Sequence, residues 1–408
     1  MNDVTALGFS KDRLRRLDEF MQSRYVASGR FPGVQVLIAR GGEIAHSSVL
    51  GLRDVERGLP VEDDTIFRIY SMTKPVTSLA FMMLVEEGLV ALDDPVAKFI
   101  PQWRDLQVFA AGGPVAFRTR PTARPMQIVD LLRHTSGLTY GIQNRTNLDA
   151  AYRGLHLAEL GYDDTLDDMI EALAALPLEF SPGEAWNYSV ATDVLGYLVG
   201  KISGVPFDQF LQRRIFDPLG MVDTGFHVPA DKASRFAACY SATPEGGLAL
   251  QDDPVTSPYL KPATLLSGGG GLVSTSADYL RFCRMLARGG ELDGARLVAP
   301  MTLALMRANH LPGGRDLAEM SQSLFSEATN AGMGFGLGFA VVEHPARTLI
   351  PCSVGEYFWG GAASTAFWID PVEDLIVIQM TQVLPSSAYP IRRELRTLVY
   401  SAMMERRG

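Results

Sequence analysis

The chain of 408 residues has little lysine, little cysteine and no long apolar run. No segment reaches the roughly 18 to 20 continuous apolar residues that a membrane-spanning helix needs. The formal net charge is −9, and no stripe of basic side chains with interleaved aromatic residues is present, which argues against a nucleic-acid partner. The 47% hydrophobic and 20% charged content is ordinary for a soluble globular protein. We therefore expect a soluble enzyme or binding protein with neither a membrane nor a nucleic acid as partner.

The cysteines are too few and too scattered for a disulfide framework or a metal site. Cys239, Cys283 and Cys352 are an odd number, lie far apart, and form neither a C-x-x-C pair nor a His/Cys cluster at ligand spacing. The first residues also lack the basic patch and apolar stretch of a secretory signal. We expect reduced, mostly buried thiols, a cytoplasmic location, and no metal or organic cofactor.

One of the six lysines has a distinctive position. Lys74 is the only lysine with a serine three residues before it, Ser71, and an apolar run follows over residues 76–85. The i, i+3 spacing puts both side chains on one face of a helix. A serine hydroxyl needs a base within hydrogen-bond reach, and a lysine can serve if a dry site lowers its pKa. The pair is therefore a candidate nucleophile and base, although an N-capping serine beside a solvated lysine would give the same pattern.

The residues around Ser71 favour a helix that begins there. Pro75 cannot lie deep inside a helix, because it lacks the N–H and its ring clashes with the preceding turn. Ser71 would then lie among the free N–H groups at the helix start, which can stabilise an oxyanion. The run that follows is apolar nearly all round, which indicates a buried helix.

The two ends of the chain carry strand patterns, and the middle carries helical ones. We expect a central sheet from both chain ends and a mainly helical insertion, with residues 1–105 and 262–408 forming one domain, residues 106–261 the other, and the active site between them. The expected strands are residues 33–40, 43–50, 334–342, 366–370 and 375–379, and the expected helices are residues 10–24, 126–133, 166–175, 188–202, 207–215 and 390–404.

A second candidate group lies in the segment that follows the turn at Pro182 and Gly183. Tyr188 is expected on an exposed loop or in a first helical turn. Near an ammonium lysine, a tyrosine hydroxyl can lose pKa and act as a general base. Taken alone, a tyrosine is more often a packing residue.

In addition, the chain resembles the serine penicillin-binding fold, specifically the class C β-lactamase-like branch and its family VIII carboxylesterases. The resemblance covers nearly the whole chain and rests on five motifs in the expected order: residues 71–74 (SMTK), 131–138 (LLRHTSGL), 181–189 (SPG through YS), 269–275 (GGGLVST) and 359–361 (WGG).

This resemblance implies a fold and a set of roles. The fold is α/β (α+β), with a central antiparallel sheet flanked by helices and a mainly helical second lobe. Ser71 would be the nucleophile, and Lys74 and Tyr188 would be a coupled base pair. The N–H groups of Ser71 and Ala362 would form the oxyanion hole. Trp359, Gly360 and Gly361 would form the substrate-binding wall.

Two departures from the β-lactamase pattern bear on the substrate. Val190 stands where β-lactamases carry asparagine, and no lysine follows Lys261, so the late strand lacks the cation that recognises a β-lactam carboxylate. Trp359 makes that wall bulkier and more apolar, which suits an uncharged ester. Arg392 or Arg393 could restore a charge, but the sequence does not place them. The resemblance therefore favours a serine carboxylesterase acting on small, short-chain esters.

Other functions stay open at this point. The same groups could serve an acyltransferase, a weak β-lactamase or peptidase, or a binding module that traps an acyl group. His134 suggests a Ser-His pair, but no G-x-S-x-G motif surrounds any serine, so we interpret it as a structural residue in a tight turn. The sequence gives neither the natural substrate nor the oligomeric state.

Overall fold

The computed structural model describes residues 4–159, 164–322 and 330–407. Within these ranges the largest sheet has eight strands, and all of their pairings are antiparallel. Both chain ends supply its strands, so the predicted central antiparallel sheet is confirmed. In spatial order the strands are β12 (Met333–Phe335), β13 (Ala340–Val342), β14 (Tyr357–Gly360), β15 (Ala366–Asp370), β16 (Leu375–Met380), β1 (Gly33–Arg40), β2 (Glu43–Asp54) and β3 (Leu59–Pro60).

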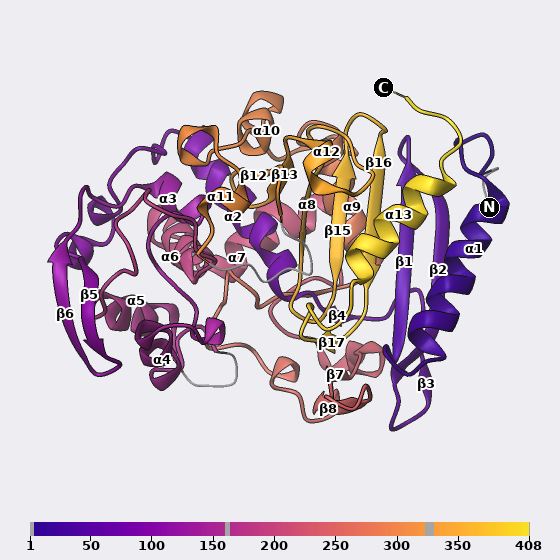
Figure 1. The fold of residues 1–408 in the computed structure, drawn as a ribbon, viewed down its shortest axis with the longest axis horizontal. Coiled ribbons are helices and arrows are strands. Elements are labelled where there is room, and N and C mark those ends of the chain that lie inside the picture. The colour runs from indigo at the N-terminus through magenta and orange to yellow at the C-terminus, as the bar shows by residue number, and fades with distance from the viewer. Residues whose placement is uncertain (1–3, 160–163, 323–329, 408) are drawn as a thin grey trace.

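Helices cover the sheet and fill the middle of the chain. In Figure 1 the sheet stands on the right with α1 and α13 beside it, and the helices of the middle segment lie to the left. The α-helices are α1 (Lys11–Met21), α2 (Thr73–Glu86), α3 (Ile128–Leu132), α4 (Asn147–Gly154), α5 (Leu166–Ala174), α6 (Ala191–Ser203), α7 (Phe207–Leu211), α8 (Asp217–Leu219), α9 (Ser276–Ala287), α10 (Pro300–Arg307), α11 (Leu317–Met320), α12 (Pro345–Thr348) and α13 (Ile391–Ala402).

The central strand β1 is apolar on both faces because both faces are covered. Val36 and Ile38 belong to the core that includes residues of α1 and α13. Leu37 points to the opposite face and joins the larger core around α2 and α9. Successive side chains of a strand alternate between faces, so one strand ties the two cores together. The larger core contains the α2 residues that follow the nucleophile candidate.

The middle of the chain holds more β-structure than its sequence suggests. A hairpin lies near its start, and a second hairpin pairs with a short strand from the C-terminal region, in parallel. The proposed division into residues 106–261 and the remainder stays a prediction. The strands outside the main sheet are β5 (Gln107–Gly113), β6 (Ala116–Pro121), β7 (Cys239–Ala242), β8 (Leu248–Asp252), β17 (Val383–Leu384), β4 (Phe67–Arg68), β9 (Val273–Ser274), β10 (Glu291–Leu292) and β11 (Ala295–Arg296).

Three local predictions differ from the structure. Residues 334–342 do not form one strand but a hairpin of β12 and β13, because the chain reverses between Phe335 and Ala340, with Gly338 at a positive φ of 104°. The helix predicted over residues 188–202 begins only at Ala191, and Tyr188 precedes it in a loop. Tyr188 is also buried, with 8% of its surface exposed, where the sequence suggested an exposed loop.

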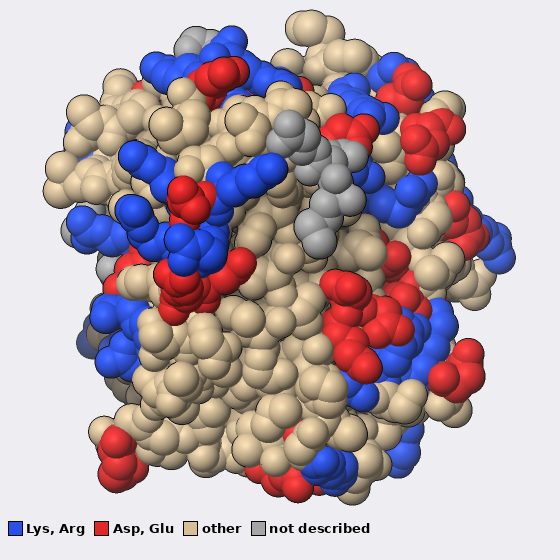
Figure 2. Space-filling model, turned by 90° about the vertical axis from the view of Figure 1, so that its right-hand side faces the viewer, with Lys and Arg blue, Asp and Glu red and all other residues tan. Residues whose placement is uncertain are grey.

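Charged side chains do not gather by sign on the face that Figure 2 shows. Blue basic groups and red acidic groups lie next to one another there, with uncharged surface between them. The net negative charge is therefore not concentrated in one patch of that face. Separately, none of the helices in the described ranges has the length and apolar character required to cross a membrane.

Candidate active site

Ser71 lies in a 3₁₀ turn that leads directly into α2. The turn spans Tyr70–Met72, and the helix continues from Thr73. Pro75 is the third residue of α2, where its missing N–H costs no helical hydrogen bond. Tyr70 has a positive φ of 44°, an uncommon conformation for a residue with a side chain. The predicted helix start at Ser71 is therefore correct to within one turn.

Lys74 lies behind Ser71 and is almost completely buried, with 1% of its surface exposed. Its Nζ donates hydrogen bonds to the backbone oxygen of Gly269 at 2.6 Å, to the hydroxyl of Tyr140 at 3.1 Å and to Ser71 Oγ at 3.3 Å. The dry environment that the sequence analysis required for this lysine is present. A solvated lysine beside a capping serine is excluded by this burial.

Tyr188 lies in the same site, with the face of its ring toward the lysine. Lys74 Nζ is 4.4 Å from the ring centre, within the range of a cation–π contact. The Tyr188 hydroxyl accepts a hydrogen bond from Trp359 Nε1 at 3.4 Å. The ring packs against those of Trp186, at 6.1 Å between centres, and Trp359, at 5.5 Å. Aromatic packing holds the ring from the sides and leaves its hydroxyl near the indole of Trp359.

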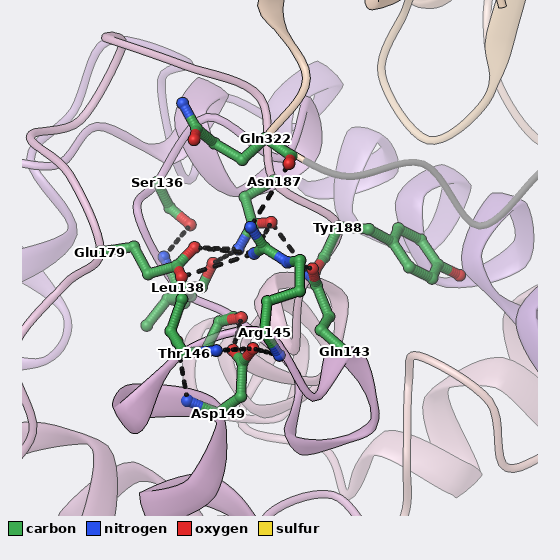
Figure 3. Close-up of polar contacts among 11 residues, drawn as sticks. Ser136, Leu138, Gln143, Arg145, Thr146, Asp149, Glu179, Asn187, Tyr188 and Gln322 are labelled. Atoms are coloured by element: carbon green, nitrogen blue, oxygen red, sulfur yellow. Dashed lines mark hydrogen bonds and ion pairs between the residues drawn. The ribbon is translucent and has the colours of Figure 1, made fainter. Parts of the chain in front are cut away.

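A buried polar network holds the backbone of the loop before Tyr188 (Figure 3). Asn187 donates to the Leu138 oxygen at 3.0 Å and to Glu179 Oε2 at 2.8 Å. Gln143 donates to Asn187 Oδ1 at 3.0 Å and to the backbone oxygen of Tyr188. In the figure the Tyr188 side chain points away from this network. The network therefore fixes where the tyrosine leaves the backbone without contacting its ring.

The strand β14 brings the Trp-Gly-Gly segment to the site, and Ala362 follows it. The Gly361 N–H donates to the Thr365 oxygen at 2.9 Å, which closes the turn into β15. Arg392 Nη2 donates to the backbone oxygens of Gly361 at 2.8 Å and Thr365 at 3.0 Å. A Cβ on Gly360 would lie 2.5 Å from that guanidinium nitrogen and 2.8 Å from the backbone oxygen of Thr365, so a larger residue would force the turn to shift. Arg392 thus binds the backbone of the predicted oxyanion loop.

These groups share one cleft of about 900 Å³. Its lining is mainly apolar and rich in aromatic rings, and a metal site is not indicated, because the described residues contain no group of three potential metal ligands. The structure therefore brings the predicted residues together, with Lys74 just behind the wall. The predicted site residues that line the cleft are Ser71, Tyr188, Trp359, Gly360, Gly361 and Ala362.

His134 is buried next to Tyr188 and does not line the cleft. It is 1% exposed, has a positive φ of 56°, and its Nδ1 is hydrogen-bonded to Ser189 Oγ at 3.2 Å. Its ring lies 5.1 Å from that of Tyr188. Burial, with a smaller effect of the Lys74 charge, lowers the pKa of His134 well below its usual value. These contacts agree with the interpretation of His134 as a structural residue in a tight turn.

Sequence reasoning missed two residues of the site, Tyr140 and Asp193. Tyr140 lines the cleft and its hydroxyl lies between Lys74 and Asp193, donating to Asp193 Oδ2 at 3.3 Å. The carboxylate of Asp193 is fully buried in α6. The sequence does contain a sign of Asp193: it is a carboxylate on the apolar face of a predicted helix, five residues after Tyr188.

The chain is similar to known proteins over nearly its whole length. The family described as Beta-lactamase matches residues 15–401. Esterase EstB of Burkholderia gladioli is 33% identical, covering 98% of both chains. Protein Rv1367c of Mycobacterium tuberculosis (strain ATCC 25618 / H37Rv) is 38% identical over 88% of this chain and 87% of its own. The solved structure of "EstCE1, a hydrolase with promiscuous acyltransferase activity" superposes with a TM-score of 0.80 at 26% identity, over 95% of this chain and 99% of that one.

Proposed function

The chain belongs to the beta-lactamase family and is a serine hydrolase of that fold, and we propose that it hydrolyses short-chain carboxylic esters through an acyl-enzyme on Ser71. The observation that carries this proposal is the 3.3 Å contact between Lys74 Nζ and Ser71 Oγ, at a helix start and beside an apolar cleft. A serine nucleophile requires a base within hydrogen-bond reach, and Lys74 is in that position. The similarity to esterase EstB supports the ester as substrate class.

The proposed reaction has two acyl-transfer steps. The Lys74/Tyr188 pair accepts the hydroxyl proton as Ser71 Oγ forms a bond to the ester carbonyl carbon. The N–H groups of Ser71 and Ala362 donate to the oxyanion, the carbon–oxygen bond to the alcohol breaks, and the pair returns the proton to the alcohol. Water then attacks the acyl-enzyme in the same way and releases the acid.

The wall around Trp359 favours an uncharged substrate. The ring lines the cleft beside the nucleophile, in the region where β-lactamases carry a lysine. Arg392 Nη2 donates hydrogen bonds to two backbone oxygens, so this nitrogen already has partners within the protein. Arg393 also lines the cleft, but no lysine follows Lys261, so we expect a β-lactamase or peptidase activity to be weak.

The test is the hydrolysis of p-nitrophenyl butyrate over many turnovers by the wild type and by Ser71→Ala. We expect sustained turnover by the wild type and its loss in the variant, because the acyl-enzyme cannot form. Ser78→Ala is the matched control, since Ser78 is a buried serine of α2, the helix that follows Ser71, and does not line the cleft. Retained activity in Ser71→Ala would refute the assignment, and a single burst by the wild type would indicate an acyl-trapping module instead.

A second candidate function is acyl transfer to an alcohol or amine. It is favoured by the similarity to EstCE1, a hydrolase with promiscuous acyltransferase activity, and the groups around Ser71 would serve either acceptor. Product analysis with an added alcohol separates the two. A transferred ester in excess over free acid would indicate that the acceptor outcompetes water.

We also retain the cytoplasm as the proposed location. It rests on the thiols, since all three cysteines are free and two of them are fully buried. Proteins of oxidising compartments more often carry disulfides.

A further inference from the structure

One stretch of the cleft wall is polar and comes from the hairpin of β7 and β8. Ser241, Gln251 and Asp252 of this hairpin line the same cleft as Ser71, and we call these three residues the hairpin arm. In Figure 1 the hairpin lies at the lower end of the sheet, next to β17, with which β7 pairs. The cleft therefore joins the aromatic wall around Trp359 to a set of polar side chains.

A β-bulge explains why two successive residues of β8 reach the cleft. Successive side chains of a regular strand point to opposite faces. In the hairpin, Asp252 pairs with Cys239 and Leu250 pairs with Tyr240, so Gln251 is an extra residue without a partner strand position. Such a bulge redirects a side chain and is common next to active sites. Gln251 and Asp252 consequently both line the cleft.

Asp252 is held by a fully buried arginine that does not line the cleft. Arg68 Nε donates to Asp252 Oδ2 at 2.7 Å, and Ser257 Oγ donates to the same oxygen at 2.9 Å. The guanidinium group lies 3.9 Å from the centre of the Phe236 ring. Arg68 also stands only three residues before Ser71. The carboxylate therefore has a fixed place relative to the nucleophile, and a guanidinium group balances its charge.

Two polar atoms of the hairpin arm are left for a ligand. Within the described ranges both hydrogen bonds to the Asp252 carboxylate end on Oδ2, and Oδ1 accepts none. This oxygen is not enclosed, and 20% of the side chain is exposed. Gln251 accepts from Ser241 Oγ at 3.1 Å, and its exposed amide nitrogen donates to no residue that the structure describes. An acceptor and a donor on successive residues match a hydroxyl group, which both donates and accepts.

The charge balance favours a neutral ligand group over a cation. The pair of Asp252 and Arg68 has no net charge, so a positive group would gain little there, whereas a hydroxyl would make a charge-assisted hydrogen bond to the carboxylate. The aromatic wall of Trp186, Tyr188 and Trp359 suits the apolar acyl chain of the proposed esters. This leaves the hairpin arm to the alcohol part of the substrate.

We propose that Asp252 and Gln251 bind a hydroxyl group in the alcohol part of the substrate, so that the preferred substrates are short-chain esters of polyhydroxylated alcohols. The inference rests on the proposed function and narrows its substrate class. Asp252 and Gln251 act in binding and take no part in the bonds that form and break. Arg68 is a positioning residue, because it holds the carboxylate without contacting the substrate.

The first experiment compares 2,3-dihydroxypropyl butyrate with propyl butyrate, which differ only in two hydroxyl groups. We expect kcat/KM of the wild type to be about tenfold higher for the dihydroxy ester, as for one hydrogen bond to a charged group. Asp252→Asn and Gln251→Met should each lower this ratio to about threefold or less, because each removes part of the hydroxyl site. A wild-type ratio near one, or a ratio that neither variant changes, would overturn the proposal.

Asp253→Asn is the matched control. Asp253 is the next residue of the chain, pairs with Arg57 at 2.9 Å and does not line the cleft, so its loss should leave the ratio at the wild-type value. If Asp252→Asn does not fold, Gln251→Met still gives the test, because Gln251 is exposed. Methyl 3-hydroxybutyrate and methyl butyrate test the acyl part in the same way. A preference confined to this second pair of esters would refute the assignment to the alcohol.

Binding to Ser71→Ala separates this inference from the proposed function. The variant cannot form the acyl-enzyme, so calorimetry measures its affinity for each intact ester. We expect the dihydroxy ester to bind about tenfold more tightly than propyl butyrate, and Asp252→Asn in the same background to remove most of this difference. If the wild type hydrolyses neither these esters nor p-nitrophenyl butyrate, the proposed function is wrong, while the affinities still decide the role of the hairpin arm. Equal affinities for the two esters would exclude the hydroxyl site.

Discussion

The two tyrosine hydroxyls of the cleft are held in opposite ways. Tyr140 is held by charges, between the ammonium of Lys74 and the carboxylate of Asp193. Tyr188 is held by rings, with His134, Trp186 and Trp359 around it. Tyr140 therefore bridges two charged groups, whereas the Tyr188 hydroxyl accepts a hydrogen bond from the indole of Trp359 and the ring of Tyr188 faces Lys74. The site thus has a polar side, formed by Lys74, Tyr140 and Asp193, and an aromatic side around Tyr188.

The sharpest test of this contrast removes one hydroxyl at a time. Tyr188→Phe should lower kcat/KM by about 10³-fold, within the range for loss of a general acid–base group. Tyr140→Phe should lower it by only about tenfold, because the lysine keeps its contact with Gly269. Tyr152→Phe, a fully buried tyrosine that does not line the cleft, is the control for loss of a hydroxyl. Equal losses for Tyr140 and Tyr188 would break the comparison.

An ion-pair cluster around Asp130 holds the segment that carries His134 on the aromatic side. Asp130 is fully buried, pairs with Arg124 at 2.7 Å and Arg133 at 2.9 Å, and accepts from Thr135 next to His134. Asp130→Asn should lower the free energy of unfolding by about 3 kcal/mol, because two guanidinium groups lose their carboxylate. Urea denaturation at pH 7 measures this change.

The same variant has a defined pH dependence. Burial raises the pKa of Asp130, but hydrogen bonds from Arg124 and Gln127 outweigh burial and hold the pKa below its usual value of 3.8. The folded pKa is therefore the lower one, so the stabilisation is complete above pH 3.8 and is lost as the pH falls through the folded value. The difference between wild type and Asp130→Asn should shrink over that window. A constant difference down to pH 2 would contradict the assignment.

The smallest expected effect concerns the contact between Trp359 and Tyr188. Trp359→Phe keeps an aromatic ring on the wall and removes the Nε1–H that donates to the Tyr188 hydroxyl at 3.4 Å. At that length we expect a loss of only about threefold in kcat, corresponding to a weak hydrogen bond. Trp103→Phe is the control, because Trp103 donates to the Ile170 oxygen and does not line the cleft. A loss as large as that of Tyr188→Phe would show that the indole, and not only the ring packing, holds the proton acceptor.

Much of the sheet lobe could be predicted from the sequence. The strands β1, β15 and β16 lie within one residue of their predicted bounds, because apolar, β-branched runs bounded by turn residues are strong strand signals. The sequence does not predict the hairpins β5–β6 and β7–β8, because β5, β6 and β8 are largely exposed and β7 is only four residues long, so none shows a regular alternation of apolar residues. The hairpin at Gly338 was read as one strand because the short apolar runs on either side of its glycines look continuous.

The sequence by itself determined that Ser71 and Lys74 share one face at a helix start, since three residues of separation suffice for that. The resemblance of its five motifs to the family further implied that Tyr188 and the segment from Trp359 to Ala362 would meet them. Only the tertiary structure decided what surrounds the lysine. Tyr140 and Gly269 lie 66 and 195 residues from Lys74 along the chain. Contacts over such separations leave no periodic pattern in a sequence, because they depend on how whole elements pack together.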